Sequence, residues 1–193
     1  KTKYAEETYD IYFNNKESFY RYDVKVLSRV STGEMLTIKI IHEMTSKWAF
    51  RYARIEKKLG NQHSVESFTY DNQTSVLNYK FEGVESFGEF HFNTTAKIHV
   101  ATPASSTAFI FLKTKKFDNT SKNTYMIFAT DNLWKYEKEP TQRPLSFERV
   151  SVNKENVKVG EAILQAYKYL LTEESEATVA STSLKEKPSF LEI

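Results

Sequence analysis

Apolar and polar residues alternate along most of this chain, and this two-residue period is the feature that most restricts its fold. In the stretch from Tyr20 to Val26, Tyr and Val alternate with Arg, Asp and Lys. A second alternating stretch runs from Leu36 to Met44. Successive side chains of a strand point to opposite faces, so the pattern predicts strands with one buried and one solvated face. The turn signal at 31–34 joins these two strands into a predicted hairpin.

Aromatic residues are abundant and glycine is scarce in this sequence. Aromatic residues make up 15% of the chain, whereas only 5 of its 193 residues are glycine. Aromatic side chains favour strands, and the Asn and Asp residues between the alternating stretches tolerate the left-handed conformation of tight turns. We therefore expect a mainly β fold in one domain over residues 1–193. The expected architecture is a single strongly curved antiparallel sheet, an open half-barrel or β-roll of roughly 10–12 strands.

Three segments depart from this regular alternation. Pro103 follows a capping residue and precedes a compact apolar stretch, which predicts one short helix near 103–114. Pro140 and Pro144 bracket a stretch that we expect to be a surface loop rather than part of a central strand. The stretch 163–171 fits a helical stripe as well as a strand, and its alternating tyrosines favour a strand.

Composition and charge exclude or disfavour several classes of protein. The net charge is +2, from 27 basic and 25 acidic residues of interspersed sign, so we expect no nucleic-acid partner. The longest apolar run, from Ala108 to Leu112, is far shorter than the roughly 20 residues of a transmembrane helix. Cysteine is absent, which excludes disulfides, thiolate metal sites and cysteine nucleophiles.

A search for chemical motifs predicts neither an enzyme nor a metal or cofactor site. The glycines form no phosphate-binding loop or dinucleotide fingerprint. His42-Glu43 resembles the start of a zinc-binding helix, but Ser46 stands where the second histidine is required. His91 and His99 could meet across a hairpin, although their spacing supplies no third ligand. An enzyme would therefore need a site assembled from residues distant in sequence.

The aromatic excess carries the functional prediction. Tyrosine combines an apolar body with a polar tip, which suits a surface that meets both water and an amphipathic ligand. The same side chains could also simply form the core. A curved sheet with one helix has few elements to cover its apolar face, so we expect part of the concave face to bind a ligand. The predicted ligand-binding residues are Tyr20, Tyr22, Leu36, Ile38, Ile40, Trp48, Phe50 and Tyr52.

The second half of the chain carries an ordered series of features. They are a short apolar helix, alternating strands and a proline before an apolar end, at 105–113, 124–128, 132–136, 148–150, 157–160, 166–169 and 188–193. This order resembles a bacterial family of exported proteins of unknown function, whose fold is similar to the lipoprotein-carrier β-roll of the periplasm. The sequence departs from the family pattern at 180–186, where members carry a Trp and an acidic pair.

The resemblance implies a half-open barrel that wraps a helix or an acyl chain near the cell envelope. We therefore expect an exported, non-enzymatic protein of the bacterial periplasm or envelope. It would bind a lipid or acyl-chain ligand and contact the membrane peripherally; the start at Lys1 fits removal of an export signal. The alternative is a protein–protein interaction module of the envelope, docking through its Tyr-rich surface or its open strand edges. A closed lipocalin-like barrel is disfavoured because no Gly-x-Trp motif lies near the first strand.

Overall fold

The computed structural model confirms the mainly β fold class. It describes residues 5–94, 98–108, 110, 122–159, 161–173 and 189–192. Within these residues the chain forms three β-sheets and one short α-helix. Its contacts divide it into two compact units, 1–115 with 128–141, and 116–127 with 142–193. Whether both units unfold in one transition is a thermodynamic property, so the single domain over 1–193 stays a prediction.

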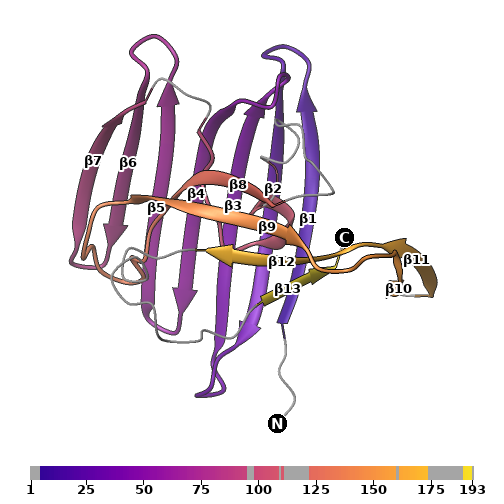
Figure 1. Cartoon of the computed structure of the whole chain (residues 1–193). Helices are drawn as coiled ribbons and strands as arrows, with labels where there is room; N and C mark the ends of the chain where they lie inside the picture. The colour runs from indigo at the N-terminus through magenta and orange to yellow at the C-terminus, as the bar shows by residue number, and fades with distance from the viewer. Residues whose placement is uncertain are drawn as a thin grey trace, which may run out of the picture. The chain divides into compact units, whose positions relative to one another are not determined.

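The first unit is built on a seven-stranded antiparallel sheet in which sequential strands are neighbours (Figure 1). The strands are β1 (Ala5–Asn14), β2 (Phe19–Arg29), β3 (Met35–Thr45), β4 (Phe50–Leu59), β5 (Gln62–Asp71), β6 (Val76–Gly83) and β7 (Phe87–Asn93). Tight turns between alternating strands produce this meander. Because β1 and β7 end the strand order without pairing to each other, the sheet is open, as expected for a half-barrel.

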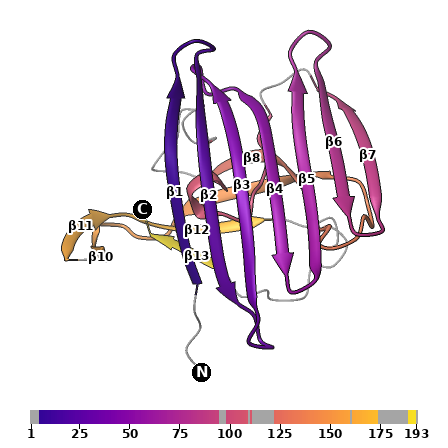
Figure 2. The same cartoon turned by 180° about the vertical axis from the view of Figure 1, so that it is seen from behind.

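The sheet has one apolar inner face and one charged outer face, as the alternation predicts. Tyr22 of β2 lies opposite His42 of β3, and both side chains are buried on the inner face. Their sequence neighbours Arg21 and Glu43 pair with each other on the outer face, where both are only partly buried. Figure 2 shows the seven strands from this outer side.

Two segments of the first unit cover the inner face of the sheet. Residues 98–110 and 128–141 contribute apolar side chains to the same core cluster, and Val100 pairs with Phe128 in an isolated β-bridge. Aliphatic and aromatic side chains fill this core together, and phenylalanines are the largest of its almost fully buried side chains. The almost fully buried phenylalanines are Phe50, Phe68, Phe81, Phe128 and, in the second unit, Phe147.

The predicted helix near 103–114 is present as the short α1 (Ser105–Ala108). Residues 109 and 111–114 of the prediction lie outside the described part of the chain. Glu7 of β1 holds the start of α1, because its carboxylate accepts hydrogen bonds from the backbone N–H groups of Ser105 and Ser106 at 2.9 and 2.8 Å. Burial opposes ionisation of Glu7, but these hydrogen bonds outweigh it and lower the pKa of the carboxyl.

The strands after residue 122 pair among themselves and do not extend the first sheet. A four-stranded sheet has the order β13-β12-β9-β8, and a separate hairpin pairs β10 with β11. The bounds are β8 (Asn123–Ala129), β9 (Thr141–Arg149), β10 (Glu155–Val159), β11 (Ala162–Ala166), β12 (Lys168–Glu173) and β13 (Ser189–Glu192). The single sheet of the prediction therefore contains seven of the strands. The connection from β7 to β8 is far too long for a hairpin turn, so the meander ends at β7.

Two local predictions for this part of the chain have different outcomes. The stretch 163–171 is extended, as predicted, although it is divided between β11 and β12. The loop predicted around Pro140 and Pro144 is wrong, because Pro144 lies within β9. Leu145, the residue after Pro144, is the first residue of β9 that pairs with the described part of β12.

Gly88 of β7 provides a test of how tightly the core is packed. A Cβ at this position would lie 2.3 Å from ring carbons of Tyr136, which packs against the core cluster. We expect Gly88→Ala to displace the ring and lower the free energy of unfolding in urea by about 1–3 kcal/mol. In a Tyr136→Ala background the same substitution should cost much less. Equal costs in the two backgrounds would contradict this packing.

Candidate functional site

Three aromatic side chains form a ladder at one end of the inner face. The ring of Phe13 on β1 lies 4.7 Å from that of Tyr20 on β2. Tyr20 in turn stacks on Trp48 in the β3–β4 turn, with ring centroids 4.6 Å apart and planes at 7°. The register explains the first contact, because Phe13 pairs directly with Tyr20. We call these three residues the aromatic ladder.

Trp48 reaches the ladder through an unusual backbone conformation. Its φ is +60°, a left-handed conformation that is an outlier for a bulky residue. The turn is held by hydrogen bonds from Trp48 N to Thr45 O and from Thr45 N to Ala49 O, both 2.8 Å long. A non-glycine residue in this conformation costs about 1–2 kcal/mol, and such strain clusters at functional sites. The indole is therefore placed at a cost in stability.

Exposed apolar side chains continue the ladder along β1. Tyr9, Ile11 and Phe13 are 56%, 52% and 45% exposed. They share the inner face, because each pairs with an inner-face residue of β2. Tyr20 and Trp48 are partly buried against the core. The inner face is thus apolar but incompletely covered at its β1 end, and we call these five residues the apolar rim.

The eight residues predicted to bind a ligand do not form one site. Four of them are at most 8% exposed and belong to the filled core, namely Tyr22, Ile38, Ile40 and Phe50. Three lie partly buried at the margin of the core, namely Tyr20, Leu36 and Trp48. The last, Tyr52, lies on the outer face. Sequence reasoning found two members of the apolar rim, Tyr20 and Trp48, but missed its three residues on β1.

Tyr52 points outward because of an irregularity in the pairing of β3 with β4. Met44 pairs with Phe50, but its neighbour Glu43 pairs with Tyr52. Arg51 is the extra residue, so the alternation is inverted after Phe50. The predicted inner-face position of Tyr52 is therefore wrong, since the regular alternation of the sequence gives no sign of this bulge.

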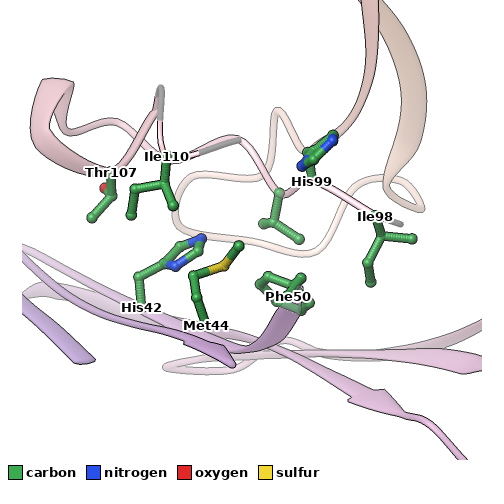
Figure 3. Close-up of a pocket in the computed structure, with 8 residues that line it drawn as sticks. His42, Met44, Phe50, Ile98, His99, Thr107 and Ile110 are labelled. Carbon is green, nitrogen blue, oxygen red and sulfur yellow. The ribbon is translucent and has the colours of Figure 1, made fainter. Parts of the chain in front are cut away.

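The cavity shown in Figure 3, in the interior of the first unit, is too small to hold a ligand. This cavity lies between the sheet and the covering segment and has a volume of about 10 Å³. That volume is about the space that one water molecule needs, whereas ligand pockets measure hundreds of Å³. Its lining residues are His42, Met44, Phe50, Ile98, His99, Val100, Thr107 and Ile110.

His42 is a buried neutral imidazole at this cavity. Burial, with a smaller contribution from His99, lowers its pKa from 6.5 to about 4. Its Nδ1 has no hydrogen-bond partner among the described residues, and its ring lies 5.5 Å from that of Phe50. His42 is therefore an ordinary core residue at neutral pH, whereas in acid its burial lowers the stability of the folded protein.

We expect the burial of His42 to make stability depend on pH. Between pH 6.5 and about 4 the unfolded chain binds a proton at His42 that the folded chain does not. Stability is therefore complete above this window and falls as the pH decreases through it, by about 3 kcal/mol in total. His42→Leu should remove this part of the pH dependence in urea unfolding series, whereas His91→Leu on the outer face should retain it. An unchanged pH dependence in His42→Leu would contradict the assignment.

A second group of buried polar side chains anchors residues 130–138 to the sheet. Lys57 donates hydrogen bonds to the carboxylate of Glu66 and, at 2.8 Å, to the backbone oxygen of Asn132. Tyr79 donates to Glu66 at 3.1 Å and accepts a hydrogen bond from the Asn132 amide at 3.0 Å. Burial and the charge of Glu66 raise the pKa of Tyr79 well above its ordinary range. These hydrogen bonds indicate a structural role.

We expect the buried ion pair between Lys57 and Glu66 to be essential for stability, because breaking it leaves a buried charge unpaired. Lys57→Met leaves the fully buried Glu66 carboxylate without its cation, so we expect a loss of about 3–5 kcal/mol in the free energy of unfolding. Combining it with Glu66→Leu removes the unpaired charge and should recover most of this loss. Urea unfolding compares the two variants; a double variant no more stable than Lys57→Met would contradict the pairing.

The outer face of the sheet carries a depression. The depression spans β1 to β4 with a volume of about 380 Å³ and is lined by charges of both signs. Two of its cations are already held by carboxylates, Arg21 by Asp23 at 2.7 Å and Arg54 by Glu56 at 2.8 Å. Among the described residues, no group of three or more His, Cys, Asp or Glu is arranged to hold a metal ion. No described helix is long and apolar enough to span a membrane.

Comparison with known proteins relates this chain to others by fold alone. Its sequence matches no family model and no curated protein. A solved structure that is similar is that of a DUF1089 family protein from Pseudomonas aeruginosa, with a TM-score of 0.54 and 9% sequence identity. The match covers 98% of this chain and 83% of that one. The fold is thus shared with a bacterial family of unknown function, which is the broader part of the expected resemblance.

Proposed function

We propose that this protein is a non-catalytic binding protein that holds an amphipathic ligand against its apolar rim. The observation that carries the proposal is Trp48. Its left-handed backbone is strained, and its indole stacks on Tyr20 in a ladder that ends at the exposed Phe13. Strain maintained at a solvent-accessible aromatic cluster is typical of a binding site.

The chemistry of the apolar rim suits a ligand with apolar and polar parts. Ile11 and Phe13 offer apolar surface, and covering such surface yields roughly 25 cal/mol per Å². Tyr9, Tyr20 and Trp48 add a hydroxyl or an indole N–H at the edge of an apolar ring. The ligand would lie on the surface at the β1 end, because the cavity deeper in the inner face holds about 10 Å³.

The titratable groups of the core support binding rather than catalysis. His42 lines a cavity with no space for a substrate. Lys57, Glu66 and Tyr79 are fully engaged in the network that anchors Asn132. None of them can both contact a ligand and transfer a proton without the core opening.

The proposed location of this binding is the bacterial periplasm or cell envelope. That part of the proposal comes from the resemblance of the second half of the sequence to exported proteins. A lipoprotein-carrier-like role would make the ligand a lipid or an acyl chain, with peripheral contact to the membrane surface. An envelope protein is the alternative partner for the same apolar rim.

Trp48→Gly separates binding from folding. Glycine adopts a positive φ without strain, so we expect the variant to be at least as stable as Trp48→Ala in thermal unfolding. It removes the central ring surface of the ladder, so affinity for 8-anilinonaphthalene-1-sulfonate and for a lysophospholipid should fall at least about tenfold in calorimetric titration. Trp134→Phe, outside the ladder, should leave both affinities unchanged. A wild-type protein that binds neither probe, or a Trp48→Gly variant that binds them normally, would contradict the proposal.

A further inference from the structure

We infer that the partner of the apolar rim is an extended polypeptide strand, with apolar and basic side chains in alternation, that adds to the free edge of β1. The inference rests on the proposed function, because it identifies the amphipathic ligand of the same site. Three features of β1 carry it: a backbone edge that no described strand pairs with, a row of exposed apolar side chains, and an aspartate that forms no ion pair with the described residues.

Among the described strands, β1 pairs on one side only. All ten of its residues pair with β2 in unbroken register, from Ala5 opposite Ser28 to Asn14 opposite Phe19. No strand in the described part of the chain pairs with its other side. Natural edge strands are commonly protected by Lys, Pro, a bulge, short length or an inward-pointing charge. Of these, β1 has only the inward-pointing Glu7, which is engaged by the backbone of α1. A regular open edge of this kind accepts an added strand.

The side chains on the inner side of β1 determine where the apolar residues of the partner lie. Tyr9, Ile11 and Phe13 occupy alternate positions and are each about half exposed. Directly opposed side chains on neighbouring strands lie roughly 5 Å apart. Every second residue of an added strand would therefore contact these three side chains and be removed from water with them. Burial of this row requires apolar residues with a two-residue period.

Asp10 determines the charge of the partner on the outer side. It lies directly opposite Asp23, and like charges in this position destabilise a sheet. Asp23 is neutralised by Arg21 at 2.7 Å. Asp10 takes part in none of the ion pairs of the described residues, although Lys25 and Arg21 lie diagonal to it on the same face. A Lys or Arg on an added strand, directly across from Asp10, would supply the missing cation.

The charge of β1 also argues against a second copy as the occupant. β1 carries Glu6, Glu7 and Asp10 and no basic residue. Pairing with the same strand of another copy would bring three further carboxylates to this edge. Glu7 is already engaged by the backbone of α1. The acidic edge of β1 thus favours a basic strand and disfavours the β1 strand of a second copy.

The test measures binding of synthetic peptides to the full chain by calorimetric titration. The probes are Lys-Val-Lys-Val-Lys-Val-Lys-Val and the matching acidic peptide with Glu in place of Lys. We expect the basic peptide to bind at least about tenfold more tightly than the acidic one, and Asp10→Lys to abolish this preference. Glu89→Lys makes the same charge change on the other edge strand, β7, and should preserve the preference. Equal losses in the two variants would overturn the inference.

A backbone-modified peptide distinguishes strand addition from simple charge attraction. The basic peptide with every backbone amide N-methylated keeps its side chains but cannot donate hydrogen bonds to β1. We expect it not to bind. Binding as tight as that of the unmodified peptide would overturn strand addition. A wild-type dimer that Asp10→Lys dissociates would also overturn the inference, in favour of a second copy on this edge.

Failure of this inference can be told apart from failure of the proposed function. If wild-type protein binds the lysophospholipid through Trp48 but binds neither peptide, the strand partner is wrong and the amphipathic site stands. If it binds neither the peptides nor the lysophospholipid, both proposals fail. If it binds both the lysophospholipid and the basic peptide, and Trp48→Gly weakens both, both proposals are supported, because the ladder is then part of the strand site.

Discussion

The structure of the first unit depends on the requirement that an open sheet with one apolar face must have that face covered. A single polypeptide with one short described helix has little material for this task. Residues 98–110 and 128–141 bring apolar side chains into the core of the sheet. Their coverage is incomplete at the β1 end, where Tyr9, Ile11 and Phe13 remain exposed. The candidate site is therefore the part of the inner face that the described residues of the first unit leave exposed.

The covering segments contain few regular hydrogen bonds of their own, so polar anchors in the core hold them in place. Asn132 illustrates this: its side-chain oxygen accepts from the backbone of Glu137 at 2.9 Å and its amide donates to Tyr79 at 3.0 Å. Lys57 and Glu66 complete the anchor from β4 and β5. A buried ion pair is weak evidence for stability in itself. Here it fixes the position of an irregular segment against a regular sheet, which apolar contacts specify less sharply.

The two-residue period was sufficient to predict the inner face of β2 and β3, because Tyr22, Ile38 and Ile40 are buried in a regular ladder. It failed where pairing departs from regularity, as at Tyr52 after the bulge. It also gave no sign that Lys57 and Glu66 are buried, because a charged residue at an inward position reads as a break in the pattern. The rim on β1 was missed for a different reason: exposure at a sheet edge depends on what the rest of the chain fails to cover.

The strand order of the sheet also determines which strands detach first in local unfolding. Each interior strand pairs with two others, whereas among the described strands β1 pairs with β2 alone and β7 with β6 alone. Local openings of a native protein occur preferentially at such weakly supported elements, and their free energies range from near zero up to that of global unfolding. The amides of β1 should accordingly exchange with solvent deuterium through local detachment, while those of β3 to β5 require much larger openings. An occupant of the free edge would convert β1 into an interior strand and give it the slow exchange of its neighbours.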